Sequence, residues 1–139
     1  SREESDHSAK MFSEYIQQHG WGFWAASLVD TGEFIGFVGL QNVPYEAHFT
    51  PAVEIGWRLA HEYWGNGYAT EGARSVLQYA FETLKLKEVV SFTAEGNQKS
   101  RNVMEKIGMH HNPEDDFDHP KIPEPHPLRR QVLYRLSRT

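Results

Sequence analysis

The chain has 139 residues, with 39% hydrophobic and 24% charged side chains, and this length and balance fit one compact globular domain over residues 1–139. It contains no cysteine, which excludes a disulfide framework and thiol catalysis and suits a reducing cytoplasm, where we expect the protein to be. A net charge of −5 argues against nucleic-acid binding, and we find neither a membrane-spanning stretch nor a signal-peptide pattern.

The first predicted elements are a helix and a β-hairpin. Ser1–Glu4 has the pattern of a capping box, apolar residues follow at helical spacing, and Gly20 predicts the end of the helix. Phe23–Val29 and Phe34–Leu40 are rich in aromatic and branched residues, and the turn signal between them ends in a glycine. These runs therefore predict two antiparallel strands.

Further along the chain, apolar periodicity predicts three more strands and two more helices. The strands are expected at Ala52–Ala60, Lys87–Ala94 and Val132–Leu136, and the helices at Ala69–Leu84 and Lys99–Ile107. Asn112–Arg130 contains five of the seven prolines and a run of acidic residues, so it predicts a long irregular loop, and such loops often carry function.

The segment Trp57–Gly72 contains the strongest functional signal. A strand ends there, a turn with Gly65 and Gly67 follows, and a long helix begins at once. The first turn of a helix has free N–H groups and a partial positive charge, and glycines let an anion approach the backbone closely. The segment therefore predicts a phosphate-binding turn.

Three interpretations of this turn compete. It can be purely structural, with glycines only for geometry. A dinucleotide-binding turn needs a third glycine where this chain has Thr70, and a hairpin, not a strand–helix–strand unit, precedes it. A P-loop is excluded because the Gly-Lys-Ser/Thr ending is missing. The third interpretation is that the turn binds the pyrophosphate of coenzyme A.

Two motifs resemble the GNAT superfamily of N-acetyltransferases, in its ribosomal-protein N-acetyltransferase (RimJ/RimL-like) branch. Glu62-Tyr63-Trp64-Gly65-Asn66-Gly67 resembles the family's Gln/Arg-x-x-Gly-x-Gly/Ala motif, with Glu62 departing from its first position. Asn97–Met109 is similar to the family's later strand-to-helix segment. The resemblance covers the whole chain but begins late, so a strand and a helix are expected to be missing before Ser1.

The resemblance implies a mixed α+β fold with a mostly antiparallel central sheet flanked by helices and two central strands that splay apart. It implies acetyl-CoA as co-substrate, with no metal. Trp57, Arg58 and Leu59 would pair with the pantetheine amides, and Asn97 would lie near the thioester. The pyrophosphate would lie on the backbone of Trp64, Gly65, Asn66, Gly67, Tyr68 and Ala69. Arg101 and Lys106 are expected near the 3′-phosphate.

Acetyl transfer needs a neutral amine and a proton for the leaving thiolate. Glu54, in the strand before the turn, is the first candidate base, unless it is solvated or paired with Arg58; His48 and His61 are weaker candidates. Many family members have a tyrosine as acid where this chain has Met104. Ser100 is the candidate that replaces it and also contacts the cofactor, unless it only satisfies the first turn of its helix.

The acceptor is expected to be a primary amine, on a protein N-terminus or a small molecule, bound by a monomer or homodimer. Asn112–Arg130 is predicted to border its site, with Glu114, Asp115, Asp116 and Asp118 attracting a cation. The histidines match no metal-ligand spacing, so we expect no metal site. Two alternatives stay open: a non-catalytic acyl-CoA-binding domain and a nicotinamide-dinucleotide-binding domain.

Overall fold

The structure is a computed structural model that describes residues 2–138, with side chains from Asp6 onward. Ser1, the predicted helix cap, lies outside the described residues. The helices are α1 (Arg2–His19), α2 (Tyr68–Glu82) and α3 (Gln98–Lys106), with short 3-10 turns η1 (His61–Tyr63) and η2 (Pro113–Asp115). The strands are β1 (Phe23–Ser27), β2 (Phe34–Asn42), β3 (Val53–Leu59), β4 (Glu88–Ala94), β5 (His110–His111), β6 (Phe117–Asp118) and β7 (Arg130–Ser137).

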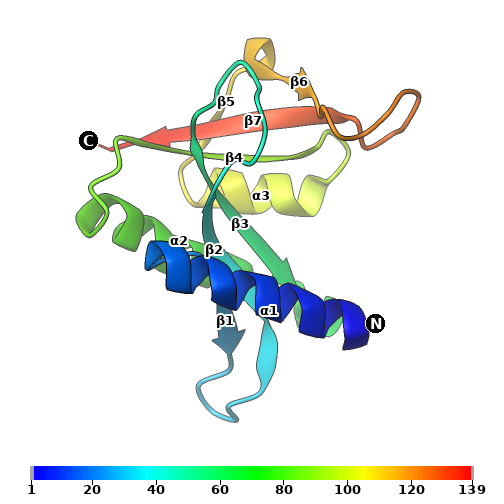
Figure 1. The fold of residues 1–139 in the computed structure, drawn as a ribbon. Helices are drawn as coiled ribbons and strands as arrows, with labels where there is room; N and C mark the ends of the chain where they lie inside the picture. Colours follow the sequence, from blue (N-terminus) through cyan, green and yellow to red (C-terminus); the bar gives the residue numbers. More distant parts are fainter. Residues whose placement is uncertain (1, 139) are drawn as a thin grey trace.

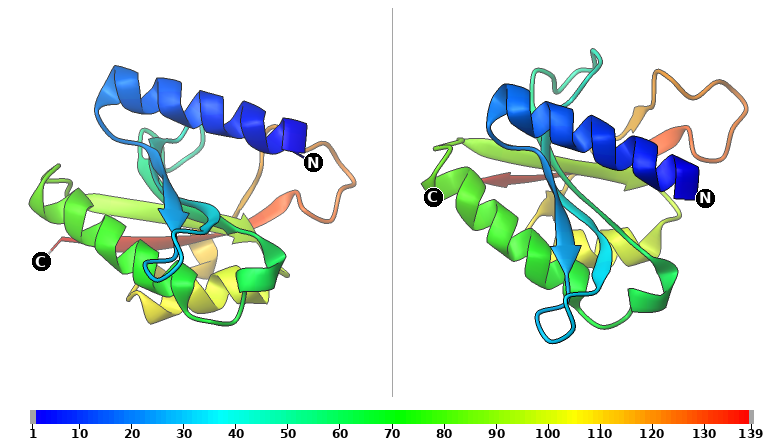
Figure 2. Two further views of the ribbon diagram at one scale, coloured as in Figure 1. Left: turned by 90° about the horizontal axis from the view of Figure 1, so that it is seen from below. Right: turned by 60° about the horizontal axis from the view of Figure 1, so that its bottom comes forward.

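The strands form one sheet in the order β1-β2-β3-β4-β7-β5, with β6 also paired to β7. Every neighbouring pair is antiparallel except β3 and β4, which run parallel. Helix α1 lies on one side of the sheet, and α2 and α3 lie on the other (Figure 1; Figure 2). The predicted mixed fold with a mostly antiparallel sheet is confirmed.

The main core lies between the sheet and helices α2 and α3. Apolar residues of α2 recur at helical spacing and face the sheet, where they pack against Leu40 and Ile55. The buried residues that α2 contributes are Ala73, Val76, Leu77 and Ala80. On the other side, Phe12 of α1 stacks on Phe23 with ring centres 5.0 Å apart and meets Phe37 edge-to-face at 4.8 Å.

Most predicted bounds shift by one or two residues in the structure, and three differences are informative. The first strand ends at Ser27, before Val29, because the turn begins at Leu28: Leu28 and Glu33 are joined by a backbone hydrogen bond and Val29 is fully exposed. Helix α3 begins at Gln98, one residue early, directly after its capping residue. The segment Asn112–Arg130 is not wholly irregular, since it contains η2 and β6. No helix in residues 2–138 is long and apolar enough to cross a membrane.

Candidate active site

The two central strands separate where the candidate site lies. The parallel ladder between β3 and β4 contains one register pair, Glu54 with Val90. The buried Ser91 hydroxyl then donates to the carbonyl of Ile55 at 2.8 Å. Beyond this point the strands diverge (Figure 1), so within residues 2–138 the edge of β3 from Gly56 to Leu59 has no partner strand on the β4 side. Its peptide groups are therefore available to a ligand that lies in the gap.

The glycine turn lies at the end of β3 and opens the N-terminus of α2. Gly65 and Gly67 have φ angles of 81° and 79°, which glycine adopts at little cost, and a Cβ on either would meet no atom within 4 Å. The first backbone bond of α2 runs from Glu71 N to Gly67 O, so the N–H groups of residues 68–70 precede the helical ladder. Among the described residues, no side chain caps this end. The turn thus fits a phosphate group.

Trp64 and Lys99 approach each other across the open end of the gap. The Trp64 ring is held by its Nε1, which donates to the carbonyl of Leu59 at 2.9 Å, and it stays 46% exposed. Lys99, in the first turn of α3, places its ammonium 4.4 Å from the ring centre. A cation therefore lies beside the turn that leads into α2.

Glu54 lies on the α1 side of the sheet, at the point where the strands part. Side chains alternate along β3, and Arg58, at an even position like Glu54, reaches Ser8 of α1 at 3.4 Å. Glu54 Oε1 accepts a hydrogen bond from Gln41 Nε2 at 2.5 Å. Burial raises the pKa of Glu54 from 4.5 to about 7, and the bond from Gln41 opposes this rise. The alternative of a solvated or Arg58-paired Glu54 is therefore wrong.

A family model described as "Acetyltransferase (GNAT) domain" matches residues 1–110, most of the chain. The chain belongs to the GNAT acetyltransferase family. Its glycine turn lies in the first family motif, and its two central strands diverge as the resemblance implied.

Two curated relatives are similar in sequence to this GNAT chain. The chain is 37% identical over 123 residues to the FsC-acetyl coenzyme A-N(2)-transacetylase of Aspergillus fumigatus, covering 86% of this chain and 51% of that protein. It is 39% identical over 83 residues to YdaF of Bacillus subtilis, a protein provisionally named a ribosomal N-acetyltransferase, covering 60% of this chain and 44% of that protein. The chain thus spans about half the length of these relatives.

An acetyltransferase from Agrobacterium tumefaciens gives the structural comparison. The two structures superpose with a TM-score of 0.68 at 33% sequence identity, over 88% of this chain and 64% of the other. The fold and the family resemblance therefore agree, and YdaF is a relative whose name matches the branch that the motifs resemble.

The second motif of this GNAT chain forms the start of α3. Asn97 caps the helix: its Oδ1 accepts from Ser100 N at 3.2 Å, and its Nδ2 donates to Thr93 Oγ1 at 3.0 Å. This capping bond uses the backbone N–H of Ser100, so the Ser100 hydroxyl remains available to another partner. Met104, where many family members have a tyrosine, is 1% exposed in the main core.

Tyr45, in the loop after β2, was missed by sequence reasoning. Its hydroxyl is buried and has no hydrogen-bond partner among the described residues. Burial, and secondarily the charge of Glu54, raise the pKa of Tyr45. The phenol is therefore a hydrogen-bond donor and not a base at neutral pH. Its ring lies 4.8 Å from that of His119 and 6.2 Å from that of Phe92, in an aromatic cluster with Phe49 and Phe117. No sequence motif predicts a role for Tyr45, because its contacts depend on how the β2–β3 loop folds back.

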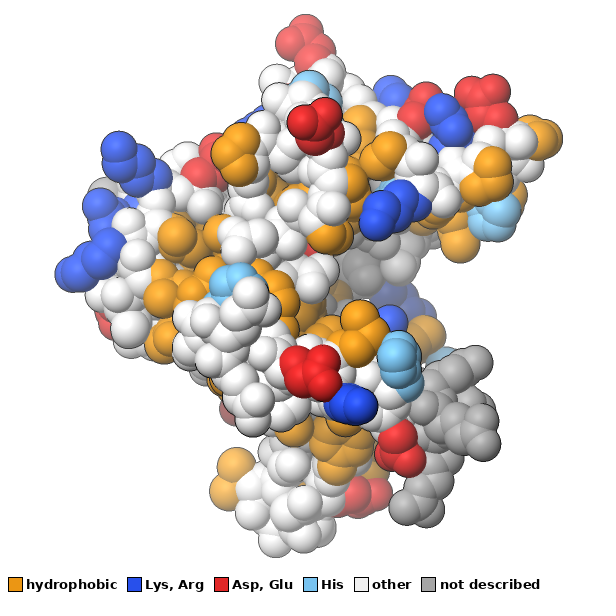
Figure 3. Space-filling view, viewed as in Figure 1, with side chains coloured by type: hydrophobic (Ala, Val, Ile, Leu, Met, Phe, Trp, Pro, Cys, Tyr) orange, Lys and Arg blue, Asp and Glu red, His pale blue; other side chains and the backbone are white. Residues whose placement is uncertain are grey.

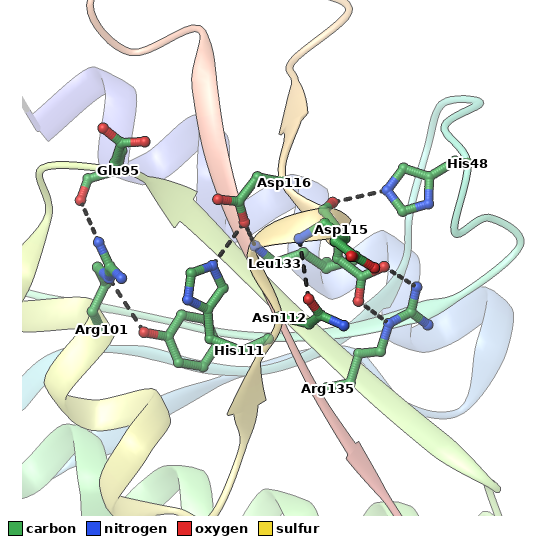
Figure 4. Close-up of polar contacts among 11 residues, drawn as sticks. His48, Glu95, Arg101, His111, Asn112, Asp115, Asp116, Leu133 and Arg135 are labelled. Carbon is green, nitrogen blue, oxygen red and sulfur yellow. Dashed lines mark hydrogen bonds and ion pairs between the residues drawn. The ribbon is translucent and has the colours of Figure 1, made fainter.

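The acidic run that was expected to attract a cation is mostly used within the chain. Asp115 binds the Arg135 guanidinium at 2.9 Å, Asp116 binds His111 at 2.8 Å, and Figure 4 shows these side chains turned toward one another. Asp118 lies 3.6 Å from Arg130. These three side chains therefore join the loop to β5 and β7. That the acidic run attracts a cationic acceptor stays a prediction.

Three further candidate residues are held by contacts within the chain. Arg101 donates to the hydroxyl of Tyr134 at 3.2 Å and to the carbonyl of Glu95 at 2.9 Å, so its guanidinium joins α3 to β7 (Figure 4). Its contact with a 3′-phosphate stays a prediction. His48 places its Nε2 2.8 Å from the carbonyl of Asp115, which ties the β2–β3 loop to η2. His61 contacts the Trp64 ring beside the glycine turn. Neither histidine replaces Glu54 as the candidate base.

The surface of the molecule has an apolar area and two hollows near α1 and the β2–β3 loop (Figure 3). Hydrophobic side chains gather between α1 and the β2–β3 loop, and the surface is hollowed on the right of this view, between α1 and the loop after β6 (Figure 3). A separate shallow pocket is lined by Val43, Tyr45, Glu46 and Thr50 of the β2–β3 loop, among others. Within the described part of the chain, no three histidine or acidic side chains cluster as metal ligands.

Proposed function

We propose that the protein transfers an acetyl group from acetyl-CoA to a primary amine, on a protein N-terminus or a small molecule. One observation carries this proposal: the glycine turn at Gly65–Tyr68 and the partly buried Glu54 flank the unpaired edge of β3. A cofactor along that edge would present its thioester beside the carboxylate.

The residues fit coenzyme A in three places. The backbone N–H groups of residues 65–69 would bind the pyrophosphate, and the free edge at Trp57, Arg58 and Leu59 would pair with the pantetheine amides. Asn97 and Ser100, at the start of α3, would lie near the sulfur. Acetyl-CoA, when bound, supplies the activated acyl carbon, and this chain's residues orient it and manage protons.

Glu54 would accept the acceptor's proton. A carboxyl with a pKa of about 7 is about half ionised at neutral pH, so it can take a proton and release it again. The neutral amine attacks the thioester carbonyl carbon, the new C–N bond forms, and the C–S bond breaks. The nitrogen's proton passes to Glu54, and the thiolate accepts a hydrogen bond from the Ser100 hydroxyl and is then protonated from solvent.

The base matters most for strongly basic acceptors. An α-amine with a pKa near 8 is about one-tenth neutral at pH 7, whereas a lysine amine with a pKa of about 10.4 is neutral about once in 2,500. The names of the relatives include both an N(2)-transacetylase and a ribosomal N-acetyltransferase. The acceptor panel should therefore contain N-terminal peptides, lysine side chains and small primary amines.

A thiol-release assay with acetyl-CoA and this panel tests the proposal. We expect release that depends on one class of amine, with the acetylated amine found by mass spectrometry. Tight binding of coenzyme A without turnover on any amine would instead support a non-catalytic acyl-CoA-binding domain, which the apolar Met104 at the usual tyrosine position favours. A thermal shift with NAD and none with coenzyme A would refute both.

A further inference from the structure

Gln41 is the residue that directly contacts the carboxyl group of Glu54. The two residues face each other in the β2–β3 register, so their side chains leave neighbouring strands on the same side of the sheet. Gln41 Nε2 donates to Glu54 Oε1 at 2.5 Å, and both side chains are partly buried. A carboxylate has two oxygens, and this bond engages one of them.

The backbone on either side of Gln41 is well anchored. Leu40 is fully buried in the main core. Asn42 binds α1 twice, because its N–H and its Nδ2 donate to the Tyr15 hydroxyl at 2.8 Å and 3.1 Å. The amide of Gln41 is therefore placed by both neighbours before any substrate arrives, which is how a residue that orients another is expected to be held.

The groups around Glu54 leave Gln41 as its main polar partner. From β4 the paired residue is the apolar Val90. From the β2–β3 loop the titratable group is Tyr45, whose pKa is raised partly by the charge of Glu54. The titratable group that α1 contributes here is Tyr15, whose hydroxyl accepts a hydrogen bond from the N–H of Asn42. Arg58 of β3 reaches Ser8. A neutral amide donor thus favours the charged carboxylate without adding a competing charge.

We propose that Gln41 is a positioning residue, which holds Oε1 of Glu54 so that Oε2 faces the acceptor amine and takes its proton. This inference rests on the proposed role of Glu54 as the base. In this role Gln41 acts through the carboxyl group of Glu54. Its effect is to fix the direction of the carboxyl group and to keep that group ionised close to neutral pH.

The test is a pH titration of Gln41→Met, which keeps the side chain's length and removes its hydrogen bonds. The Glu54 carboxyl is followed by carbon NMR with coenzyme A bound, and acetyl transfer to the best amine of the panel is followed over the same pH range. We expect the Glu54 pKa and the acidic limb of kcat/KM both to move upward by about one pH unit.

A matched control is Gln78→Met. Gln78 also donates to a glutamate, Glu82 at 3.1 Å, but on the exposed side of α2, so the substitution should leave both titrations unchanged. Where the Met variant does not fold, Gln41→Glu serves instead. It keeps size and polarity, and should raise the Glu54 pKa further, because two adjacent carboxyls share one proton.

Each outcome decides the inference. An unmoved Glu54 titration in Gln41→Met overturns it, and so does a moved titration with an unmoved pH–rate profile, since Gln41 would then serve structure alone. Failure of the proposed function looks different: the unmodified chain transfers acetyl to no amine, while the NMR titration still responds to Gln41. That result would remove the catalytic role of Gln41 together with that of Glu54.

Discussion

The ammonium of Lys99 lies 4.4 Å from the centre of the Trp64 ring, and this contact joins the two segments that carry the family motifs. Trp64 belongs to the turn before α2 and Lys99 to the first turn of α3. The two helix N-termini both carry partial positive charge, and Lys99 adds a full charge between them. The open end of the strand gap is therefore the place in this fold where a polyanionic cofactor is expected to enter.

Replacing Lys99 with methionine should weaken coenzyme A binding about three- to ten-fold, because an attraction of about 1 kcal/mol to the cofactor's phosphates is lost. Isothermal titration calorimetry measures this, and the deficit should shrink at high salt. Lys10→Met, on the exposed side of α1, is the matched control and should bind as the unmodified chain does. Equal affinity for Lys99→Met and the control would place the phosphates elsewhere.

Gly67→Ala should destabilise the turn even though space is available. A Cβ there meets no atom within 4 Å, so the cost comes from the φ angle of 79°, and it should be about 1–2 kcal/mol by urea unfolding. Gly67→Asn should cost less, since asparagine tolerates this conformation. Gly96→Ala has the same open space without a left-handed φ, so it serves as control. Equal stabilities of the two alanine variants would contradict the conformational explanation.

Ser100→Ala should separate a chemical role from a structural one. The helix cap uses the backbone N–H of Ser100, so loss of the hydroxyl should change the free energy of unfolding by less than about 0.5 kcal/mol. If the hydroxyl serves the leaving thiolate, kcat should fall about ten-fold or more with coenzyme A affinity unchanged. Asn97→Ala is the contrasting variant and should lose about 1 kcal/mol of stability. An unaltered kcat in Ser100→Ala would leave that hydroxyl without a role in transfer.

Glu54 should make stability fall as pH rises. Its pKa is about 7 in the folded chain against an ordinary 4.5, so between these values the folded state binds more protons than the unfolded state. The stability present below about pH 4.5 is therefore lost as pH rises through about 7, by roughly 3 kcal/mol in total. Urea unfolding of Glu54→Gln across this range should lack that slope. A parallel slope in both proteins would assign the pH dependence to other groups.

The sequence predicted the parts of this molecule that local patterns determine. The alternation in Ala52–Ala60, the apolar stripe of Ala69–Leu84 and the glycines of the turn each reflect backbone geometry within a few residues. Gly65 and Gly67 do adopt left-handed φ angles, and Asn97 does cap its helix. The positions of these segments were therefore predictable without any knowledge of tertiary contacts.

The contacts around Glu54 were not predictable in this way. Gln41 meets Glu54 only because a particular β2–β3 register aligns residues 13 apart in sequence, and a slip of one residue would move Gln41 to the other face. Tyr45 depends on the fold of a ten-residue loop, Val43–Ala52. The partners of the acidic run were not predictable either, because composition shows charges but not the arginines that pair with them, such as Arg135.

The pH–rate profile of Glu54→Gln tests the central claim most directly. With the best acceptor of the panel, kcat should fall by about 100- to 10,000-fold and the acidic limb near pH 7 should disappear, while the affinity for coenzyme A stays the same. The amide keeps the shape of the side chain and cannot accept the acceptor's proton. An unchanged rate with an unchanged acidic limb would contradict the account and remove Glu54 as the base.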